Sequence, residues 1–209
     1  KDLFHEDYKS HFNKNSNLEA LKGKLPKIKK HLAEYYNCTE EEICTGDYEP
    51  NKEETTCPYK IILGNADFSF SKVTDLGNLQ IIGGHAHFVN SEVTNLGNLK
   101  SIGGDTSFIC SKVTDLGNLQ SIGGVADFKY SEITDLGNLE SIGGNASFIC
   151  SKVTDLGNLK SIGGSACFEN SKVTNLGNLQ SIGGNADFSN SKITDLGNLQ
   201  HLGGSAYFR

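Results

Sequence analysis

The chain lacks three features that would place it in a familiar functional class. No apolar run approaches the roughly 20 residues that a transmembrane helix needs, so we expect a soluble protein that does not contact a membrane. The net charge is −6 and no basic stripe is present, which argues against direct binding of nucleic acid. No phosphate-binding loop, nucleophile elbow, zinc-protease motif or calcium loop occurs, so we predict that the protein is not an enzyme.

A signal peptide is also missing, but the chain begins at Lys1 rather than at methionine. We interpret the chain as a trimmed or processed product, so that secretion stays open.

The six cysteines do not form a regular disulfide framework: Cys38, Cys44 and Cys57 precede the repeats, and Cys110, Cys150 and Cys167 lie in them. Cys110 and Cys150 hold the same repeat position two copies apart, which is about 9–10 Å at strand spacing and beyond the ~7 Å limit for a disulfide. We expect reduced thiols and a cytoplasmic protein. The alternative is a secreted protein with a Cys38–Cys44 or a Cys44–Cys57 bond.

Residues 1–60 differ in composition from the rest, and we predict that they form a mainly helical cap with a linker. The segment "LPKIKKHLAEYY" (Leu25–Tyr36) places its apolar residues on one helical stripe, with Pro26 in the first turn. The segment 3–12 is a weaker helix candidate. Such a cap would seal the exposed end of a stack of repeats.

After this helix, the capping-box spacing of Thr39 and Glu42 predicts a short helical turn over "EEEIC". The polar segment Gly46–Pro58 is interpreted as a linker or hairpin. The spacing of Cys38, Cys44 and Cys57 fits no zinc pattern, so we predict no metal and no cofactor in this region.

From Ile62 onward the sequence repeats every twenty residues without a slip, which predicts a solenoid of about seven coils over residues 61–209. Each coil contains an Ala-x-Phe strand with both side chains pointing inward. The segment "V-x-x-L-x-x-L-x-x-I" has a period of three, which suits bends and short extended pieces rather than an α-helix. We expect tight backbone approach at the Gly pair (Gly83–Gly84) and a corner at Gly77–Asn78.

The segment "ADFSNSKI" (Ala186–Ile193) resembles the strand pattern of leucine-rich repeats, and "LGNLQSIGG" resembles the coils of receptor L-domain-like and short bacterial or phage repeat proteins. The resemblance covers the repeat tract and implies architecture rather than activity. Serine stands where these families have a buried asparagine, so any internal ladder would be built from hydroxyls (Ser71 to Ser191). Since no helix fits the period, we expect a nearly straight, β-rich rod.

Two repeated or paired polar features have competing interpretations. One is a column of aspartates, interrupted by Asn95 and Asn175, that either caps turns through its side chains or binds cations. The other is the pair His85 and His87, which could hold a metal but has no third ligand nearby in sequence. We favour the turn role for the first and an ordinary surface position for the second.

The outward strand positions vary from coil to coil while the apolar columns do not. A uniform scaffold with one variable face is how solenoids present a surface to a partner. The alternative is that these positions drift because packing ignores them. We predict a non-enzymatic binder, adaptor or inhibitor of another protein, with a structural or cell-surface repeat protein as the alternative. The predicted partner-binding residues are His85, His87, Val89, Asp105, Ser107, Ile109, Val125, Asp127, Lys129, Tyr130, Asn145, Ser147, Ile149 and Glu169.

The last coil, which begins at Ser191, has a neighbour on one side only in this sequence, and its strand edge is unpaired. Either a partner or a second copy of the chain covers this end, or the natural chain continues; we expect weak, detectable self-association through it. Light scattering over a wide concentration range should detect it, and a strictly monomeric profile would count against it.

Overall fold

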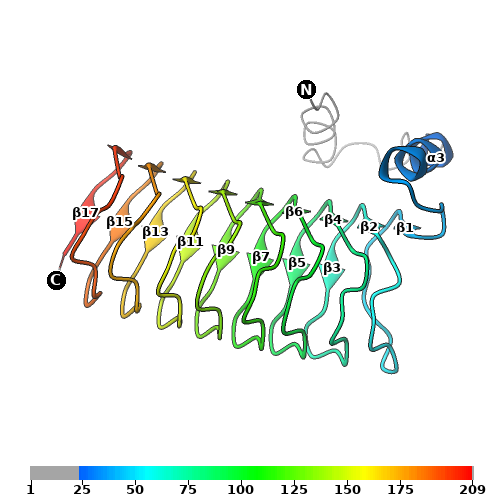
Figure 1. Cartoon of the computed structure of the whole chain (residues 1–209), viewed down its shortest axis with the longest axis horizontal. Coiled ribbons are helices and arrows are strands. Elements are labelled where there is room, and N and C mark those ends of the chain that lie inside the picture. Colours follow the sequence, from blue (N-terminus) through cyan, green and yellow to red (C-terminus); the bar gives the residue numbers. More distant parts are fainter. Residues whose placement is uncertain (1–23, 209) are drawn as a thin grey trace.

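The computed structural model of the chain describes residues 24–208, which form one helix followed by a stack of parallel β-coils (Figure 1). From Ile61 onward each coil contributes a two-residue strand to each of two sheets, and each of these strands pairs with its equivalent twenty residues away, as Ser141 does with Ser161. About eight coils lie side by side in an almost straight row. This confirms the predicted fold class, a β-rich solenoid with an N-terminal helix.

The two sheets alternate along the chain. Sheet A contains β1 (Ile43–Cys44), β2 (Ile61–Ile62), β4 (Ile81–Ile82), β6 (Ser101–Ile102), β8 (Ser121–Ile122), β10 (Ser141–Ile142), β12 (Ser161–Ile162), β14 (Ser181–Ile182) and β16 (His201–Leu202). Sheet B contains β3 (Ala66–Asp67), β5 (Ala86–His87), β7 (Thr106–Ser107), β9 (Ala126–Asp127), β11 (Ala146–Ser147), β13 (Ala166–Cys167), β15 (Ala186–Asp187) and β17 (Ala206–Tyr207).

The predicted apolar columns form the interior. The phenylalanines from Phe68 to Phe168 are completely buried, as are the valine, leucine and isoleucine columns of the same coils. The rings stack nearly parallel, with centroids 5.0 Å apart and planes 5° apart for Phe148 and Phe168. The sequence predicts that the whole phenylalanine column is buried, and this is wrong at its last member. Phe208 is 64% exposed, because in the described part of the chain only one coil covers it.

The segment with period three holds the turns and the sheet A strand of each coil. Gly77 has φ +59° at the first corner, a conformation that side chains disfavour. At the second corner, a Cβ on Gly83 would collide with the carbonyl oxygen of Leu63 on the previous coil. Glycine is therefore required there by the close approach of two backbones rather than by a positive φ.

The solenoid begins earlier in the chain than the repeat. Strand β1 pairs with β2, and Tyr48 and Cys57 are buried against the first perfect coil. The segment Gly46–Pro58 is therefore part of a coil and not a linker. The predicted helical turn over "EEEIC" is also wrong: a turn leads directly into β1, although the Thr39 N–H does donate to Glu42 Oε2 at 2.8 Å.

Helix α3 (Leu25–Tyr36) has the predicted bounds and ends at Asn37, which adopts a left-handed conformation with φ 50°. It packs on the outward column of sheet A, where Ile43, Ile61 and Ile81 stand in place of the serines of later coils. The helix thus covers the side of the first coils (Figure 1). The weaker helix candidate at 3–12 lies outside the described residues.

The serine column does not form the hydroxyl ladder that the sequence suggested. Ser71 Oγ donates to the Phe68 carbonyl at 2.8 Å. The hydroxyls of the next five serines are buried and have no hydrogen-bond partner within the described structure: Ser91, Ser111, Ser131, Ser151 and Ser171. Backbone hydrogen bonds join the coils instead, such as Phe88 N–H to the Ser107 carbonyl at 2.8 Å. No helix between residues 24 and 208 is long and apolar enough to cross a membrane.

Replacing Phe148 with alanine should reduce the free energy of unfolding by about 3–5 kcal/mol, since the cavity cannot collapse between two stacked rings. Denaturant unfolding followed by circular dichroism would measure the loss. Phe70→Ala is a matched control, because Phe70 is 75% exposed and its truncation leaves no cavity. A loss below about 1 kcal/mol for Phe148→Ala would contradict the ring stack.

Candidate partner-binding face

The outward residues of sheet B and of its adjoining corner form four columns, which we call together the B face. Column one is Asp47, Asn65, His85, Asp105, Val125, Asn145, Ser165 and Asn185. Column two is Glu49, Asp67, His87, Ser107, Asp127, Ser147, Cys167 and Asp187. Column three is Ser69, Val89, Ile109, Lys129, Ile149, Glu169 and Ser189. The corner column is Phe70, Asn90, Cys110, Tyr130, Cys150, Asn170 and Asn190. All fourteen predicted partner-binding residues lie in these columns, and their role in binding stays a prediction.

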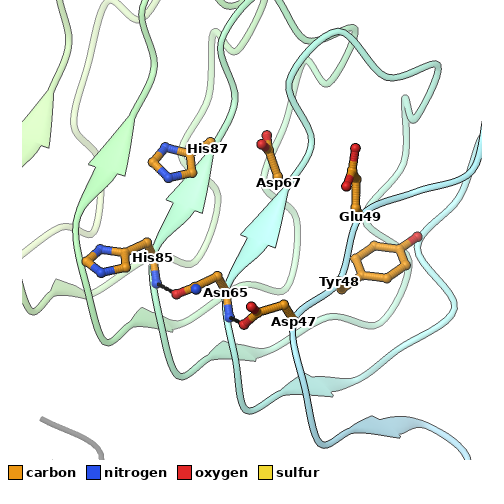
Figure 2. A pocket seen from close by; sticks show the side chains of 7 residues that line it. All are labelled: Asp47, Tyr48, Glu49, Asn65, Asp67, His85 and His87. Atoms are coloured by element: carbon orange, nitrogen blue, oxygen red, sulfur yellow. Dashed lines mark hydrogen bonds between the residues drawn. The ribbon is translucent and has the colours of Figure 1, made fainter. Parts of the chain in front are cut away.

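Column one is not free to vary, because its side chains join successive coils. Asn65 Oδ1 accepts a hydrogen bond from the N–H of His85 at 2.8 Å, and His85 Nδ1 accepts one from the N–H of Asp105 at 2.9 Å (Figure 2). Asp47, Asp105, Asn145, Ser165 and Asn185 accept in the same way from the next coil. A side chain that offers an acceptor is therefore favoured at each position of this column. We call this chain of contacts the acceptor ladder.

Val125 is the exception in the acceptor ladder. Its side chain has no acceptor to offer to the N–H of Asn145, although Val125 N–H itself donates to Asp105 Oδ1 at 2.7 Å. Val125 is also 37% exposed, so its apolar side chain faces solvent. The ladder is thus interrupted at one coil, near the middle of the rod.

The corner column has a second structural requirement, because every residue in it adopts a left-handed conformation with φ between 49° and 55°. Asparagine tolerates this conformation better than most residues with a side chain, and Asn90, Asn170 and Asn190 follow that preference. Tyr130 adopts φ 55° and leaves its ring 58% exposed. A large side chain thus occupies a position that favours a small polar one.

The residues beside Tyr130 are also apolar. Cys110 and Cys150 precede and follow it in the corner column and are exposed. Ile109 and Ile149 are half-buried on either side of Lys129 in column three. We call Val125 and these five residues (Tyr130, Cys110, Cys150, Ile109 and Ile149) the central patch. It crosses the width of the B face over three neighbouring coils.

Column two holds its carboxylates in place locally. Asp67, Asp127 and Asp187 each accept a hydrogen bond from the N–H two residues later, at 2.9–3.0 Å. Asp127 Oδ2 also lies 3.3 Å from the ammonium nitrogen of Lys129, on the coil that carries Val125 and Tyr130. The central patch therefore surrounds an ion pair that is itself half-buried.

The end of the B face near the helix is hollowed into a basin of about 430 Å³. Figure 2 shows Glu49, Asp67 and His87 in one row and Asp47, Asn65 and His85 in the other, with the basin between them. Three carboxylates thus line one shallow depression. Tyr48 lies at its inner wall, and burial raises the pKa of its hydroxyl far above the usual range.

The histidine pair lies on neighbouring columns of the B face. His85 Nδ1 accepts a hydrogen bond from the N–H of Asp105, so the lone pair of this nitrogen is already used within the protein. The ring centroids of His85 and His87 are 6.5 Å apart and stack nearly parallel. The position of His85 follows from the acceptor ladder.

A second cluster brings Cys167, Glu169 and Asp187 together, with one ligand atom of each within 4.8 Å of the others. Burial raises the pKa of the Cys167 thiol, and the carboxylates of Asp187 and Glu169 raise it further. The thiol therefore stays protonated at neutral pH, and a protonated thiol is a poor metal ligand and a poor nucleophile. We assign no metal to this cluster.

The aspartate column on the other edge of the coils takes the turn role. Asp75, Asp135 and Asp155 each accept a hydrogen bond from the N–H of the glycine two residues later, at 2.6–2.7 Å. Asn95 and Asn175 accept in the same way, which explains why asparagine replaces aspartate there. The column is thus part of the scaffold.

Sequence reasoning located the B face but missed the rules that act within it. The acceptor ladder has a signal, since seven of the eight residues in column one carry an oxygen or nitrogen acceptor. The corner column has a weaker sequence signal, which is the recurrence of asparagine at Asn90, Asn170 and Asn190. With both preferences known, the coil of Val125 and Tyr130 stands out among the described coils, because it departs from both of them. Comparison of the chain with protein-family models, curated proteins and solved structures finds no match.

Thiol reactivity should separate the exposed corner from the interior. Iodoacetamide should alkylate Cys110 and Cys150 rapidly at pH 8 and leave Cys57 unmodified until the protein unfolds. Burial raises the pKa of the Cys57 thiol to about 11, so little thiolate forms there at that pH. Mass spectrometry of the digested protein would measure each rate. Equal rates for Cys57 and Cys110 would contradict the burial of the first coil.

Proposed function

We propose that the protein is a non-enzymatic interaction module that binds another protein through the B face, with the central patch as the anchor. The observation that carries the proposal is that the coil of Val125 and Tyr130 is the one described coil that departs from both structural preferences of the B face, an acceptor in column one and an asparagine at the left-handed corner. Val125 interrupts the acceptor ladder, and Tyr130 occupies a left-handed corner. Both departures place an apolar group in solvent.

The departures are costly for the free protein. A bulky residue in the left-handed region costs about 1 kcal/mol relative to one that suits it. A missing hydrogen bond costs about another 1 kcal/mol. Natural proteins keep such locally unfavourable residues mainly at functional sites, where the loss in stability is offset by function.

Drift at unconstrained surface positions predicts a different pattern. It would favour polar residues at exposed positions, and acceptors and asparagines at the two constrained ones. The central patch instead gathers one valine, one tyrosine, two cysteines and two isoleucines over three coils. Exposed aromatic and aliphatic groups clustered in the middle of a surface are typical of the core of an interface.

As a finer proposal, we suggest that the chain acts as an adaptor or inhibitor of the leucine-rich-repeat-like type found in bacteria and phages. The support is the repeat pattern, in which an inward Ala-x-Phe strand is followed by a serine and a closing valine or isoleucine. The second strand of each coil stands where longer leucine-rich repeats have a helix. That difference suits a straight rod with a flat face rather than a concave one.

The double variant Val125→Asn with Tyr130→Asn should be more stable than the original protein by about 1–2 kcal/mol, because it restores both structural rules. The same variant should lose binding to proteins retained from an extract of the native source. Denaturant unfolding would measure the gain in stability, and affinity capture followed by titration with the purified partner would measure the loss of binding.

A matched control places asparagine where both rules already hold. Ser165→Asn keeps an acceptor in column one, two coils away from Val125, and should change neither stability nor binding by more than about 0.5 kcal/mol. If the double variant binds as well as the original protein, the partner does not use the central patch. If the double variant is less stable, the physical premise is wrong.

A further inference from the structure

We propose that the partner of the B face is a basic protein segment, rich in lysine or arginine on both sides of an apolar group. The inference rests on the proposed function and specifies the chemistry of the partner. Its support is the distribution of charge between the B face and the rest of the solenoid, together with the basin at one end of the face.

The negative charge of the repeats is concentrated on the B face. Between residues 61 and 208, the face carries five carboxylates and a single lysine: Asp67, Asp105, Asp127, Glu169 and Asp187, with Lys129. All other positions in the same range carry eight carboxylates and seven lysines, so they are nearly neutral together. The first coil adds Asp47 and Glu49 to the face. The excess negative charge therefore lies on the same face as the central patch.

Four of the seven lysines outside the B face, Lys72, Lys112, Lys152 and Lys160, pair with a glutamate on a neighbouring coil. Lys112 pairs with Glu92, and Lys160 with Glu140, in contacts of 2.6–2.8 Å across neighbouring coils. On the B face, Lys129 pairs with Asp127, and His85 Nδ1 lies 3.5 Å from Asp105 Oδ2. The three carboxylates of the basin, Asp47, Glu49 and Asp67, have no lysine or arginine within ion-pair distance among the described residues. A cationic partner would supply the missing positive charge, which is the usual form of electrostatic complementarity at an interface.

The carboxylates flank the central patch along the rod. Asp47, Glu49 and Asp67 line the basin at the end near the helix, and Glu169 and Asp187 lie on the coils that follow the patch. At strand spacing, Asp67 lies about 14 Å from the coil of Tyr130 and Glu169 about 10 Å from it. An extended segment that crosses the face would need its basic residues at those separations from its apolar centre.

The basin suits the end of a lysine or arginine side chain. Its volume of about 430 Å³ is larger than one side chain, and it is open to solvent. Two of its three carboxylates already accept hydrogen bonds from backbone N–H groups, which fix their orientation: Asp47 from Asn65 and Asp67 from Ser69. A guanidinium or ammonium group would therefore meet carboxylates that are held in place before it binds.

The test uses a short synthetic peptide with an apolar centre and lysines at both ends, and a matched peptide with glutamates in place of the lysines. Fluorescence anisotropy would measure the binding of each to the full chain at low and at high salt. The lysine peptide should bind at low salt and weaken as the ionic strength rises. The glutamate peptide should not bind.

Two triple variants remove equal charge from different surfaces. Asp47→Asn, Asp67→Asn and Asp105→Asn remove three of the seven carboxylates of the B face and keep each side-chain oxygen that accepts a hydrogen bond. Asp75→Asn, Asp135→Asn and Asp155→Asn do the same at the turn column. The first triple variant should bind the lysine peptide with about tenfold lower affinity than the original protein, and the second should bind it with nearly the original affinity.

Each outcome decides a separate claim. Three results would overturn the proposal that the partner is basic. They are an equal loss of affinity in both triple variants, no binding of the lysine peptide, and equal binding of the two peptides. In the last case the apolar anchor could still stand, and the variant Val125→Asn with Tyr130→Asn tests it in the same assay. If that variant binds the lysine peptide as tightly as the original protein while the first triple variant does not, the charge inference holds and the central patch fails as the anchor.

Discussion

The stack of phenylalanine rings inside the solenoid is the constraint on which the rest of the structure depends. Neighbouring rings lie 4.9–5.5 Å apart from Phe68 to Phe208, so each coil must place its ring directly over the previous one. An inserted residue in any coil would displace one ring and turn the outward side chains of a strand inward. The strict twenty-residue period follows from this, and so does the straightness that lines up the outward columns.

Because of this regularity, a residue that differs from its equivalents in the other coils can be recognised as unusual. Because every coil repeats the same backbone, a position in column one meets the same demand for an acceptor in each coil, and a corner position the same left-handed conformation. The repeats thus act as internal controls for one another. The coil of Val125 and Tyr130 is recognisable as unusual because each of the other described coils has an acceptor in column one, an asparagine at the corner, or both. A non-repetitive protein would offer no such comparison.

Much of the fold could be predicted from the sequence because period and burial coincide in a solenoid. The inward strand residues and the bounds of α3 followed from spacing alone. The first coil could not be found in this way, since Tyr48 and Cys57 fill the interior without matching the repeat. The B face followed from alternation, whereas the acceptor ladder depends on which backbone N–H points toward the previous coil, and that direction is visible only in three dimensions. The prediction of a hydroxyl ladder was wrong for a related reason: the sequence places the serines in one buried column but does not show that their hydroxyls find no hydrogen-bond partner within the described structure.

The central claim is that the B face, and within it the coil of Val125 and Tyr130, is the surface that a partner covers. Hydrogen–deuterium exchange of the protein, alone and with its bound partner, tests this claim most directly. The account predicts slower exchange in the complex for backbone amides from 125 to 130 and for the equivalent segments 105–110 and 145–150. It predicts no change in the sheet A strands β8 and β10 of the same coils. Protection confined to sheet A, or to the turn column at Asp135 and Asp155, would contradict it.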